Sequence, residues 1–172
     1  GTAFAQIVAE QLCLNWENID IDYPVMDSNT FEKYQGQLTG GSYSVHEMFD
    51  KLSRHAAIAR VILLEAGADL MGSEVEDCKV ADSRVIDTIF DQEISFSEIL
   101  SETTINYEIL QEDLENADLI QRQNFKVVGK SLPAIDIPEK LNGTARFGID
   151  AYVPNMQYAK IIKPPTRLGA KI

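Results

Sequence analysis

Residues 44–72 read SVHEMFDKLSRHAAIARVILLEAGADLMG and carry the strongest periodic pattern in the chain. Apolar side chains recur there at spacings of three and four residues, which is the period of an α-helix. The middle, residues 56–64, is apolar almost all round except for Arg60. Such a helix is buried between layers, so we expect it to pack on a sheet. The positions of the stripe are Phe49, Leu52, Ala56, Ala59, Leu63, Ala66 and Leu70.

Both ends of this helix carry sequence signals. Ser44 and Glu47 fit the S-x-x-E capping box, in which each side chain accepts a hydrogen bond from a backbone N–H group at the helix start. Gly72 follows the last apolar residue of the stripe and is typical of a C-terminal stop. The sequence therefore predicts a helix from about residue 44 to residue 71.

The flanking segments predict shorter elements. Residues 3–12 have helical spacing, with Thr2 as a possible cap. Residues 15–23 alternate loosely and predict a short strand. A hairpin is expected over residues 75–80 and 84–89, and a strand over residues 125–129. Ser95 and Glu98 form a second capping box, which predicts a helix to residue 102. Residues 108–118 are either a weak helix or a solvated linker.

The composition changes beyond residue 124, where prolines and glycines divide the chain into short extended pieces. We expect a subdomain boundary between residues 120 and 130. The expected fold class is α+β: a long buried helix packed on a mixed sheet, followed by a β-rich C-terminal segment.

The length, charge and cysteine content exclude several classes of protein. The 172 residues suffice for one domain or two small ones, and 45% hydrophobic residues are ordinary for a globular chain. With 15 basic and 27 acidic residues, the net charge of −12 disfavours nucleic acid and anionic membrane surfaces as partners. No apolar run approaches the roughly 18 residues of a transmembrane helix. Two cysteines, Cys13 and Cys78, cannot ligate an iron–sulfur cluster by themselves, and we expect ordinary packed thiols.

A glycine- and serine-rich loop is the best candidate for a binding site. It contains Thr39, Gly40, Gly41, Ser42 and Ser44, directly before the long helix. Glycine lets backbone approach a ligand closely, and a helix start offers free N–H groups together with the positive end of the helix dipole. These features favour an anion such as a phosphate. The spacing alone leaves open a plain turn with a cap, because neither the P-loop nor the dinucleotide fingerprint is present.

Other candidates are weaker. Gly1 and Thr2 open the first expected helix and form a second possible anion site by the same physics. His46 and His55 are nine residues apart on one helix, which puts them on opposite sides, so we expect no metal site. The acids over residues 112–118 lack the order of a calcium loop and indicate a solvated face. No catalytic residue can be assigned from spacing.

The sequence resembles the large, molybdopterin-binding subunit of the xanthine dehydrogenase (molybdenum hydroxylase) family, in the branch of the isoquinoline 1-oxidoreductase beta-subunit. The match covers most of the chain, although Ala134, Met71 and Asn155 depart from the residues common in the family. Four blocks carry the resemblance. Residues 1–12 are similar to the end of a G-Q-G-x-x-T-type helix start, and residues 39–44 are similar to a T-G-G-S-x-S loop. The other two blocks are residues 56–78 and residues 129–171, of which the latter are similar to the opening of an inserted α/β-hammerhead domain.

This resemblance implies a function. Such proteins bind molybdopterin, usually as the cytosine dinucleotide in bacteria, and hydroxylate N-heteroaromatic rings or aldehydes with oxygen from water. It implies that the two candidate helix starts, at Gly1 and Thr2 and at residues 39–44, contact the cofactor. It also implies a separate small subunit with two iron–sulfur clusters, and a catalytic glutamate in a part of the large subunit that this chain does not contain.

The resemblance further implies a domain organisation. Residues 1–124 would be part of the molybdenum-cofactor-binding domain, and residues 125–172 a linker and the start of the hammerhead. We expect the chain to be a fragment of a longer polypeptide and to be inactive by itself. The sequence does not distinguish between a cytoplasmic and a periplasmic location. The alternative is a non-catalytic assembly or interaction module that kept the fold.

Overall fold

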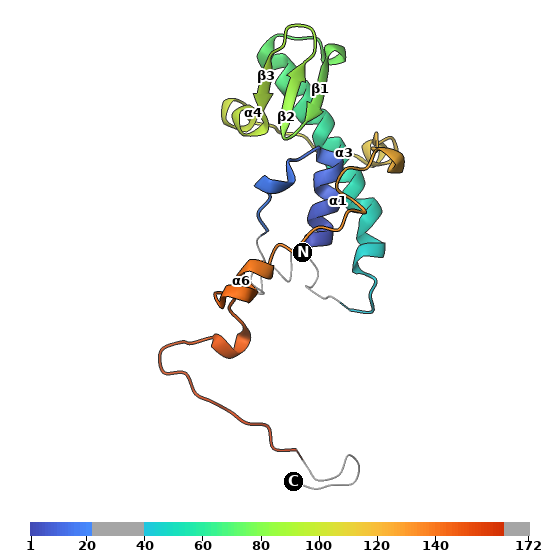
Figure 1. Cartoon of the computed structure of the whole chain (residues 1–172). Helices are drawn as coiled ribbons and strands as arrows, with labels where there is room; N and C mark the ends of the chain where they lie inside the picture. Colours follow the sequence, from blue (N-terminus) through green and yellow to red (C-terminus); the bar gives the residue numbers. More distant parts are fainter. Residues whose placement is uncertain (22–39, 164–172) are drawn as a thin grey trace. The chain divides into compact units, whose positions relative to one another are not determined.

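The computed structural model describes residues 1–21 and 40–163. The chain divides into two compact units, Gly1–Ile135 and Asp136–Ile172. The first unit holds two long helices and a three-stranded antiparallel sheet (Figure 1). The expected α+β class is therefore confirmed, and the described strands form an antiparallel sheet where a mixed one was expected.

Helix α3 (Ser44–Met71) is the long helix that the periodicity predicts. It ends at Gly72, which has a left-handed φ of 69° and donates its N–H to Asp69 O, as expected for a glycine stop. In the middle of the predicted stripe Ala56 and Leu63 are buried and the other residues are half-buried. Its two ends, Phe49 and Leu70, stay 37% and 41% exposed.

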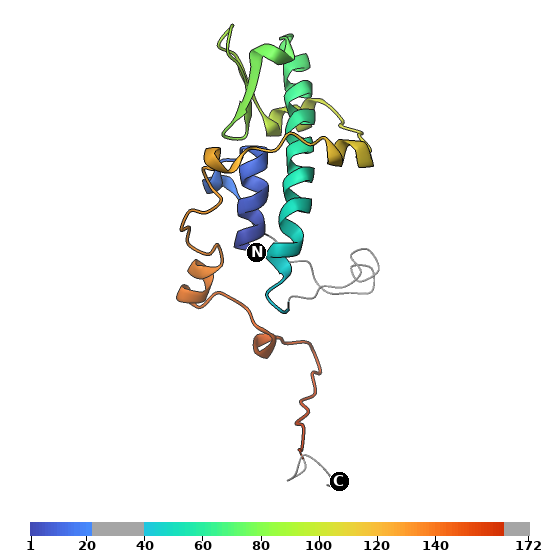
Figure 2. The same cartoon turned by 90° about the vertical axis from the view of Figure 1, so that its right-hand side faces the viewer.

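Helix α1 (Thr2–Leu12) lies beside α3 with its chain running in the same direction, so both helices begin at the same end of the pair (Figures 1 and 2). Small buried residues on the two helices, Ala9, Ser53, Ala56 and Ala57, leave room for close packing. The expected helix over residues 3–12 is confirmed.

The sheet consists of β1 (Cys78–Ala81), β2 (Arg84–Asp87) and β3 (Glu93–Ser95) in that order. Asp82 and Ser83 connect β1 to β2 with φ values of 48° and 64°, the pattern of a two-residue hairpin turn. The predicted hairpin is confirmed, and β3 is a strand that the sequence did not indicate.

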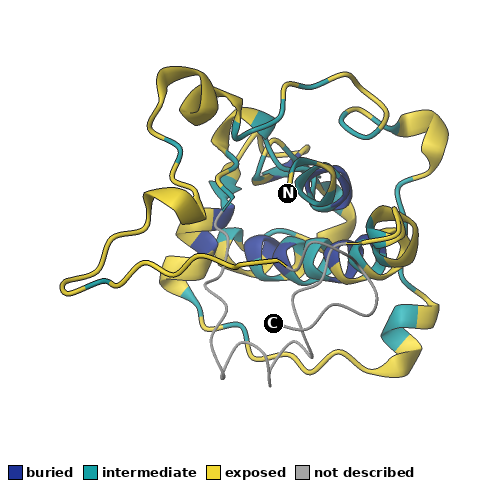
Figure 3. Ribbon diagram, turned by 90° about the horizontal axis from the view of Figure 1, so that it is seen from below, coloured by how far each residue is buried: buried dark blue, intermediate teal, exposed yellow. Residues whose placement is uncertain are grey.

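The core forms where the sheet packs on the second half of α3. Its buried members are Leu63 in α3, Val85 in β2, and Phe96 and Ile99 in α4 (Phe96–Glu102). Buried residues gather in α1, α3 and around the sheet, whereas residues 136–163 are exposed or partly exposed (Figure 3).

Several predicted strands are wrong. Within residues 15–21 the structure has only the short 3-10 helix η1 (Trp16–Asn18), because the Asn15 side chain accepts the N–H of Glu17 and turns the chain. Residues 125–129 form turns, and residues 136–163 contain no strand within their described length. The remaining short elements are η2 (Val75–Asp77), α5 (Gln111–Glu115), η3 (Arg122–Asn124), α6 (Ile137–Asn142) and η4 (Gly148–Asp150).

The capping box at Ser95 and Glu98 forms as predicted. The Ser95 hydroxyl accepts the Glu98 N–H at 3.2 Å, and the Glu98 carboxylate accepts the Ser95 N–H at 2.9 Å. We expect Ser95→Ala to lower the free energy of unfolding by about 1 kcal/mol, because the N–H group of Glu98 at the helix start loses its acceptor. Urea denaturation measures this loss, with the exposed Ser101→Ala in the same helix as the comparison. Equal effects of both changes would contradict it.

Asp87 is a buried carboxylate, 1% exposed, at the last residue of β2, where the following turn begins. It accepts the Ser73 hydroxyl and the N–H groups of Phe90 at 2.9 Å and Ile89 at 2.7 Å. These hydrogen bonds, that of Ser73 foremost, hold the pKa of Asp87 below its usual range.

This arrangement predicts an acid-sensitive contribution to stability. A folded-state pKa below the unfolded value stabilises the fold above the unfolded pKa, and the contribution is lost as pH falls through the folded pKa. We expect Asp87→Asn to destabilise the chain at pH 7 and to remove part of its loss of stability below about pH 4. Denaturation at several pH values checks this. Asp91→Asn, at an exposed position of the same turn, is the control. If the Asp87→Asn variant lost as much stability as the unmodified chain between pH 7 and acid pH, the expectation would be contradicted.

Candidate functional site

The predicted loop before α3 forms a tight turn. Tyr43 donates its N–H to Gly40 O at 3.3 Å, and Gly41 and Ser42 both have left-handed backbone, with φ of 61° and 60°. A Cβ atom at Gly41 would lie 2.9 Å from Cδ2 of Tyr43, so backbone angle and space both disfavour a side chain there. Thr39 lies outside the described residues.

The start of α3 differs from the prediction at its cap. Tyr43 is the N-cap, no side chain caps the helix, and Ser44 is its first helical residue. The predicted capping box of Ser44 and Glu47 is therefore wrong: the N–H of Glu47 donates to Tyr43 O at 2.9 Å, in the ordinary helical pattern. The N–H groups of residues 44–46 have no acceptor within the helix, so the start of α3 offers donors.

The start of α1 also differs from the prediction. Gly1 is the N-cap, and Thr2 is the first helical residue. The Thr2 hydroxyl does not cap α1; its Oγ1 accepts the N–H of Ile135 at 3.2 Å. Thr2 thus has a structural partner that the sequence did not indicate.

The fold brings the two predicted anion sites to one end of the helix pair. Because α1 and α3 run in the same direction, Gly1 and the turn over residues 40–43 both lie at the end where the helices begin (Figures 1 and 2). The positive ends of two helix dipoles therefore point the same way. Glu47 and Asp50, in the first turns of α3, are the acidic side chains closest in sequence to this end.

Sequence reasoning missed a segment that crosses the helices. Residues 118–135, the crossing segment, pass over α3 and α1 and then run down α1 towards its start (Figure 2). Side chains on one polar face of α1 hold this segment. The contacts pair Gln11 with Ile120, Glu10 with Lys126, Val127 and Val128, Gln6 with Val127 and Lys130, and Thr2 with Ile135.

Among these side chains, Glu10 contacts the largest number of residues in the crossing segment. It is 4% exposed, and its carboxylate accepts the N–H of Lys126 at 2.9 Å, of Val127 at 2.7 Å and of Val128 at 2.8 Å. These N–H groups therefore cannot form the strand that the sequence predicted over residues 125–129. The sequence signal was a row of polar residues at positions 2, 6 and 10, spaced by four along a helix whose only other polar residue is Gln11.

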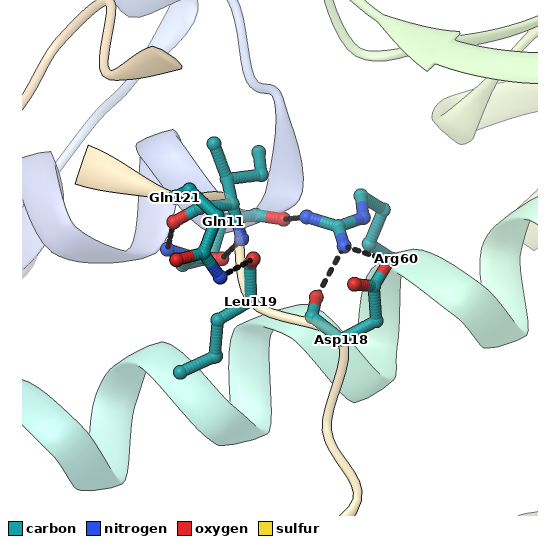
Figure 4. Close-up of polar contacts among 6 residues, drawn as sticks. Gln11, Arg60, Asp118, Leu119 and Gln121 are labelled. Carbon is teal, nitrogen blue, oxygen red and sulfur yellow. Dashed lines mark hydrogen bonds and ion pairs between the residues drawn. The ribbon is translucent and has the colours of Figure 1, made fainter. Parts of the chain in front are cut away.

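Arg60 finds its partners at the other end of the crossing segment (Figure 4). Its guanidinium donates to Gln11 O at 2.8 Å and to Asp118 O at 2.5 Å, with the Asp118 carboxylate 3.4 Å away. Gln11 in turn accepts the Ile120 N–H at 2.8 Å. The cation in the apolar middle of α3 therefore fastens α1 and the crossing segment to α3.

The other candidates have structural roles or none. Nδ1 of His55 lies 2.7 Å from Lys51 O, and the residues that the structure describes contain no group of three side chains able to hold a metal. Asp113 in the acidic stretch accepts the Leu110 N–H at the start of α5. Burial raises the pKa of the Cys13 and Cys78 thiols, which keeps both protonated at neutral pH. Among the described helices, none has the length and apolar content to cross a membrane.

Comparisons with known proteins identify relatives but no matching family model. The chain is 35% identical, over its whole length, to the membrane-bound aldehyde dehydrogenase (pyrroloquinoline-quinone) of Gluconacetobacter polyoxogenes. It is 30% identical to the B subunit of nicotinate dehydrogenase from Pseudomonas putida and 22% identical to the beta subunit of isoquinoline 1-oxidoreductase from Brevundimonas diminuta, each over 95% of its length.

The chain spans 22%, 13% and 25% of the lengths of these three relatives. Two of them are named as subunits, and all three names denote oxidoreductases. The match to an isoquinoline 1-oxidoreductase beta-subunit agrees with the resemblance found in the sequence. The chain is therefore homologous to part of each of three bacterial oxidoreductases.

Proposed function

We propose that this chain is a segment of the large subunit of a molybdenum hydroxylase, in the branch of the isoquinoline 1-oxidoreductase beta-subunit. In this proposal the chain contacts molybdopterin cytosine dinucleotide through the start of α3 and, less extensively, the start of α1. The observation that carries it is the similarity of nearly the whole chain to three oxidoreductases.

The names of the relatives support a substrate class. Two of these proteins are named for N-heteroaromatic compounds, nicotinate and isoquinoline, and one for aldehydes. We propose that the complete enzyme hydroxylates a substrate of one of these two classes with oxygen from water.

The donors at the two helix starts fit the phosphates of such a cofactor. Gly40 and Gly41 are exposed and carry no side chain that would block a ligand, and the N–H groups of residues 44–46 lack acceptors within α3. Ser42 and Ser44 add hydroxyl donors. The Thr2 hydroxyl accepts the N–H of Ile135, which leaves its own O–H group to donate.

The bound cofactor would supply the hydroxylation chemistry, and this chain would supply binding and orientation. The catalytic glutamate would lie in another part of the same large subunit, and the iron–sulfur clusters in a small partner subunit. Residues 1–124 would belong to the cofactor-binding domain and residues 125–172 to the linker and the opening of the α/β-hammerhead. The alternative is a non-catalytic module that assembles with other proteins.

The test is the cofactor content of the native polypeptide, purified from its source cells. We expect stoichiometric molybdenum by mass spectrometry and cytidine monophosphate after acid hydrolysis. Pyrroloquinoline quinone is assayed in the same sample, because the name of one relative includes it. A preparation with pyrroloquinoline quinone and no molybdenum would overturn the proposal, and one with neither would favour the non-catalytic module.

A variant tests the role of the loop. In the same native polypeptide we expect Gly41→Val to lose most of the bound molybdenum, because a side chain there strains the left-handed backbone and meets the Tyr43 ring. The control is Gly148→Val, where an added Cβ has no atom within 4 Å. Thermal unfolding of both variants separates loss of fold from loss of cofactor. Unchanged molybdenum in a folded Gly41→Val protein would exclude a role for this turn.

A further inference from the structure

A cleft of about 540 Å³ opens between α3 and the crossing segment. It is lined by Phe49 of α3 and by six residues of the crossing segment, and all seven belong to the first compact unit. Its size lies within the range of small-molecule sites in proteins. The residues from the crossing segment are Arg122, Gln123, Phe125, Val128, Gly129 and Lys130.

The charge of this cleft is opposite to that of the chain. The chain carries a net charge of −12, yet the crossing segment contains three basic residues and one acidic residue, Asp118, which pairs with Arg60. Two of the basic residues, Arg122 and Lys130, line the cleft, and no acidic residue does. Within residues 1–21 and 40–163, neither side chain has a hydrogen-bond or ion-pair partner. Unpaired cations in a cleft of an acidic chain attract anions.

The cleft also offers aromatic surface. Phe49 is 37% exposed although it belongs to the apolar stripe of α3, and Phe125 of the crossing segment, which also lines the cleft, is partly exposed. Aromatic rings favour planar ring ligands by offset or edge-to-face packing. Gly129 leaves the wall open, since a Cβ there would have no atom within 4 Å.

We propose that this cleft binds a planar aromatic anion: a ring that packs on Phe49 and Phe125 and carries a negative group that pairs with Arg122 and Lys130. A nucleotide and an N-heteroaromatic carboxylate share this chemistry. An acidic peptide would use the cations but leave the rings uncovered. The proposal depends only on the residues of the cleft, so it stands or fails independently of the proposed cofactor.

The first experiment compares ligands on the unmodified 172-residue chain by isothermal titration calorimetry. The probes are cytidine monophosphate, pyridine-3-carboxylate, neutral cytidine and inorganic phosphate. We expect at least one aromatic anion to bind about tenfold more tightly than both cytidine and phosphate, and to weaken as salt rises, because exposed charges are screened. Preference for cytidine monophosphate identifies a nucleotide site, and preference for pyridine-3-carboxylate identifies a site for a carboxylate substrate.

The second experiment locates the site with matched variants. We expect Lys130→Gln to weaken the bound aromatic anion about five- to tenfold, and Phe125→Leu to weaken it severalfold. Lys79→Gln on β1 removes the same charge from an exposed position outside the cleft, and we expect no change. Circular dichroism confirms that each variant is folded. Binding of neither aromatic anion, equal binding of cytidine or phosphate, or equal effects of Lys130→Gln and Lys79→Gln would each overturn the proposal.

Discussion

We expect Glu10→Gln to lower the free energy of unfolding by about 3 kcal/mol, a large fraction of the stability of a small domain. The Glu10 carboxylate is 4% exposed and accepts N–H groups from three consecutive residues of the crossing segment. A glutamine amide offers one oxygen, and its NH₂ group would face a backbone N–H group. Backbone donors with little access to water would then lack partners.

Two measurements check this expectation. Urea denaturation gives the loss of stability, and hydrogen exchange locates it: the amides of Lys126, Val127 and Val128 should exchange faster. Glu17→Gln makes the same substitution at an exposed position of η1, and we expect a change within about 0.5 kcal/mol. If the three amides kept their protection in Glu10→Gln, the carboxylate would not be what fastens the crossing segment to α1.

The second large effect is expected at Gly67, where α3 packs against Val85 of β2 and Ile99 of α4. A Cβ atom there would lie 2.7 Å from Cγ2 of Val85 and 3.0 Å from Cδ1 of Ile99. Neither side chain can move away easily, because both are fully buried. Alanine is favoured over glycine in a helix by about 1 kcal/mol, but overpacking a core costs about 1–3 kcal/mol and sometimes more.

Overpacking should therefore win, and we expect Gly67→Ala to lower the free energy of unfolding by about 1–2 kcal/mol net. Chemical denaturation measures the change. The matched control is Gly40→Ala, where an added Cβ has no atom within 4 Å. Adding Val85→Ala to Gly67→Ala tests the mechanism: the double variant should lose less than the sum of the two single variants. A stabilised Gly67→Ala protein would show that helix propensity outweighs the crowding.

The elements predicted correctly depend on local patterns. The apolar period of α3 and its stop at Gly72, the capping box of α4, and the hairpin turn at Asp82 and Ser83 each follow from contacts between residues near in sequence. The capping box at Ser44 failed because Tyr43 is the N-cap and Ser44 is already the first helical residue. The S-x-x-E pattern thus marks a helix start only when its serine lies just before the first helical residue.

In the candidate site, too, some features follow from the local sequence and others depend on contacts between distant residues. The turn at residues 40–43 and its place before a helix follow from the local sequence, and so does the positive end of the helix dipole. That α1 begins at the same end as α3, and that Thr2 binds Ile135, depends on residues far apart in the chain. Apolar and β-branched residues predicted a strand over 125–129, but the pattern could not indicate that Glu10 would take those N–H groups.

Local sequence suffices for the α+β class, the extent of the long helix and the glycine turn before it, because each depends on backbone propensities and on side chains within one or two helical turns. The parallel pairing of α1 with α3, the path of residues 118–135 over them, and the cationic cleft that this path creates arise only in the folded chain. They depend on hydrogen bonds between residues 49 to 133 positions apart. No local pattern records such contacts, since the partner of a buried polar group is fixed only when the chain folds.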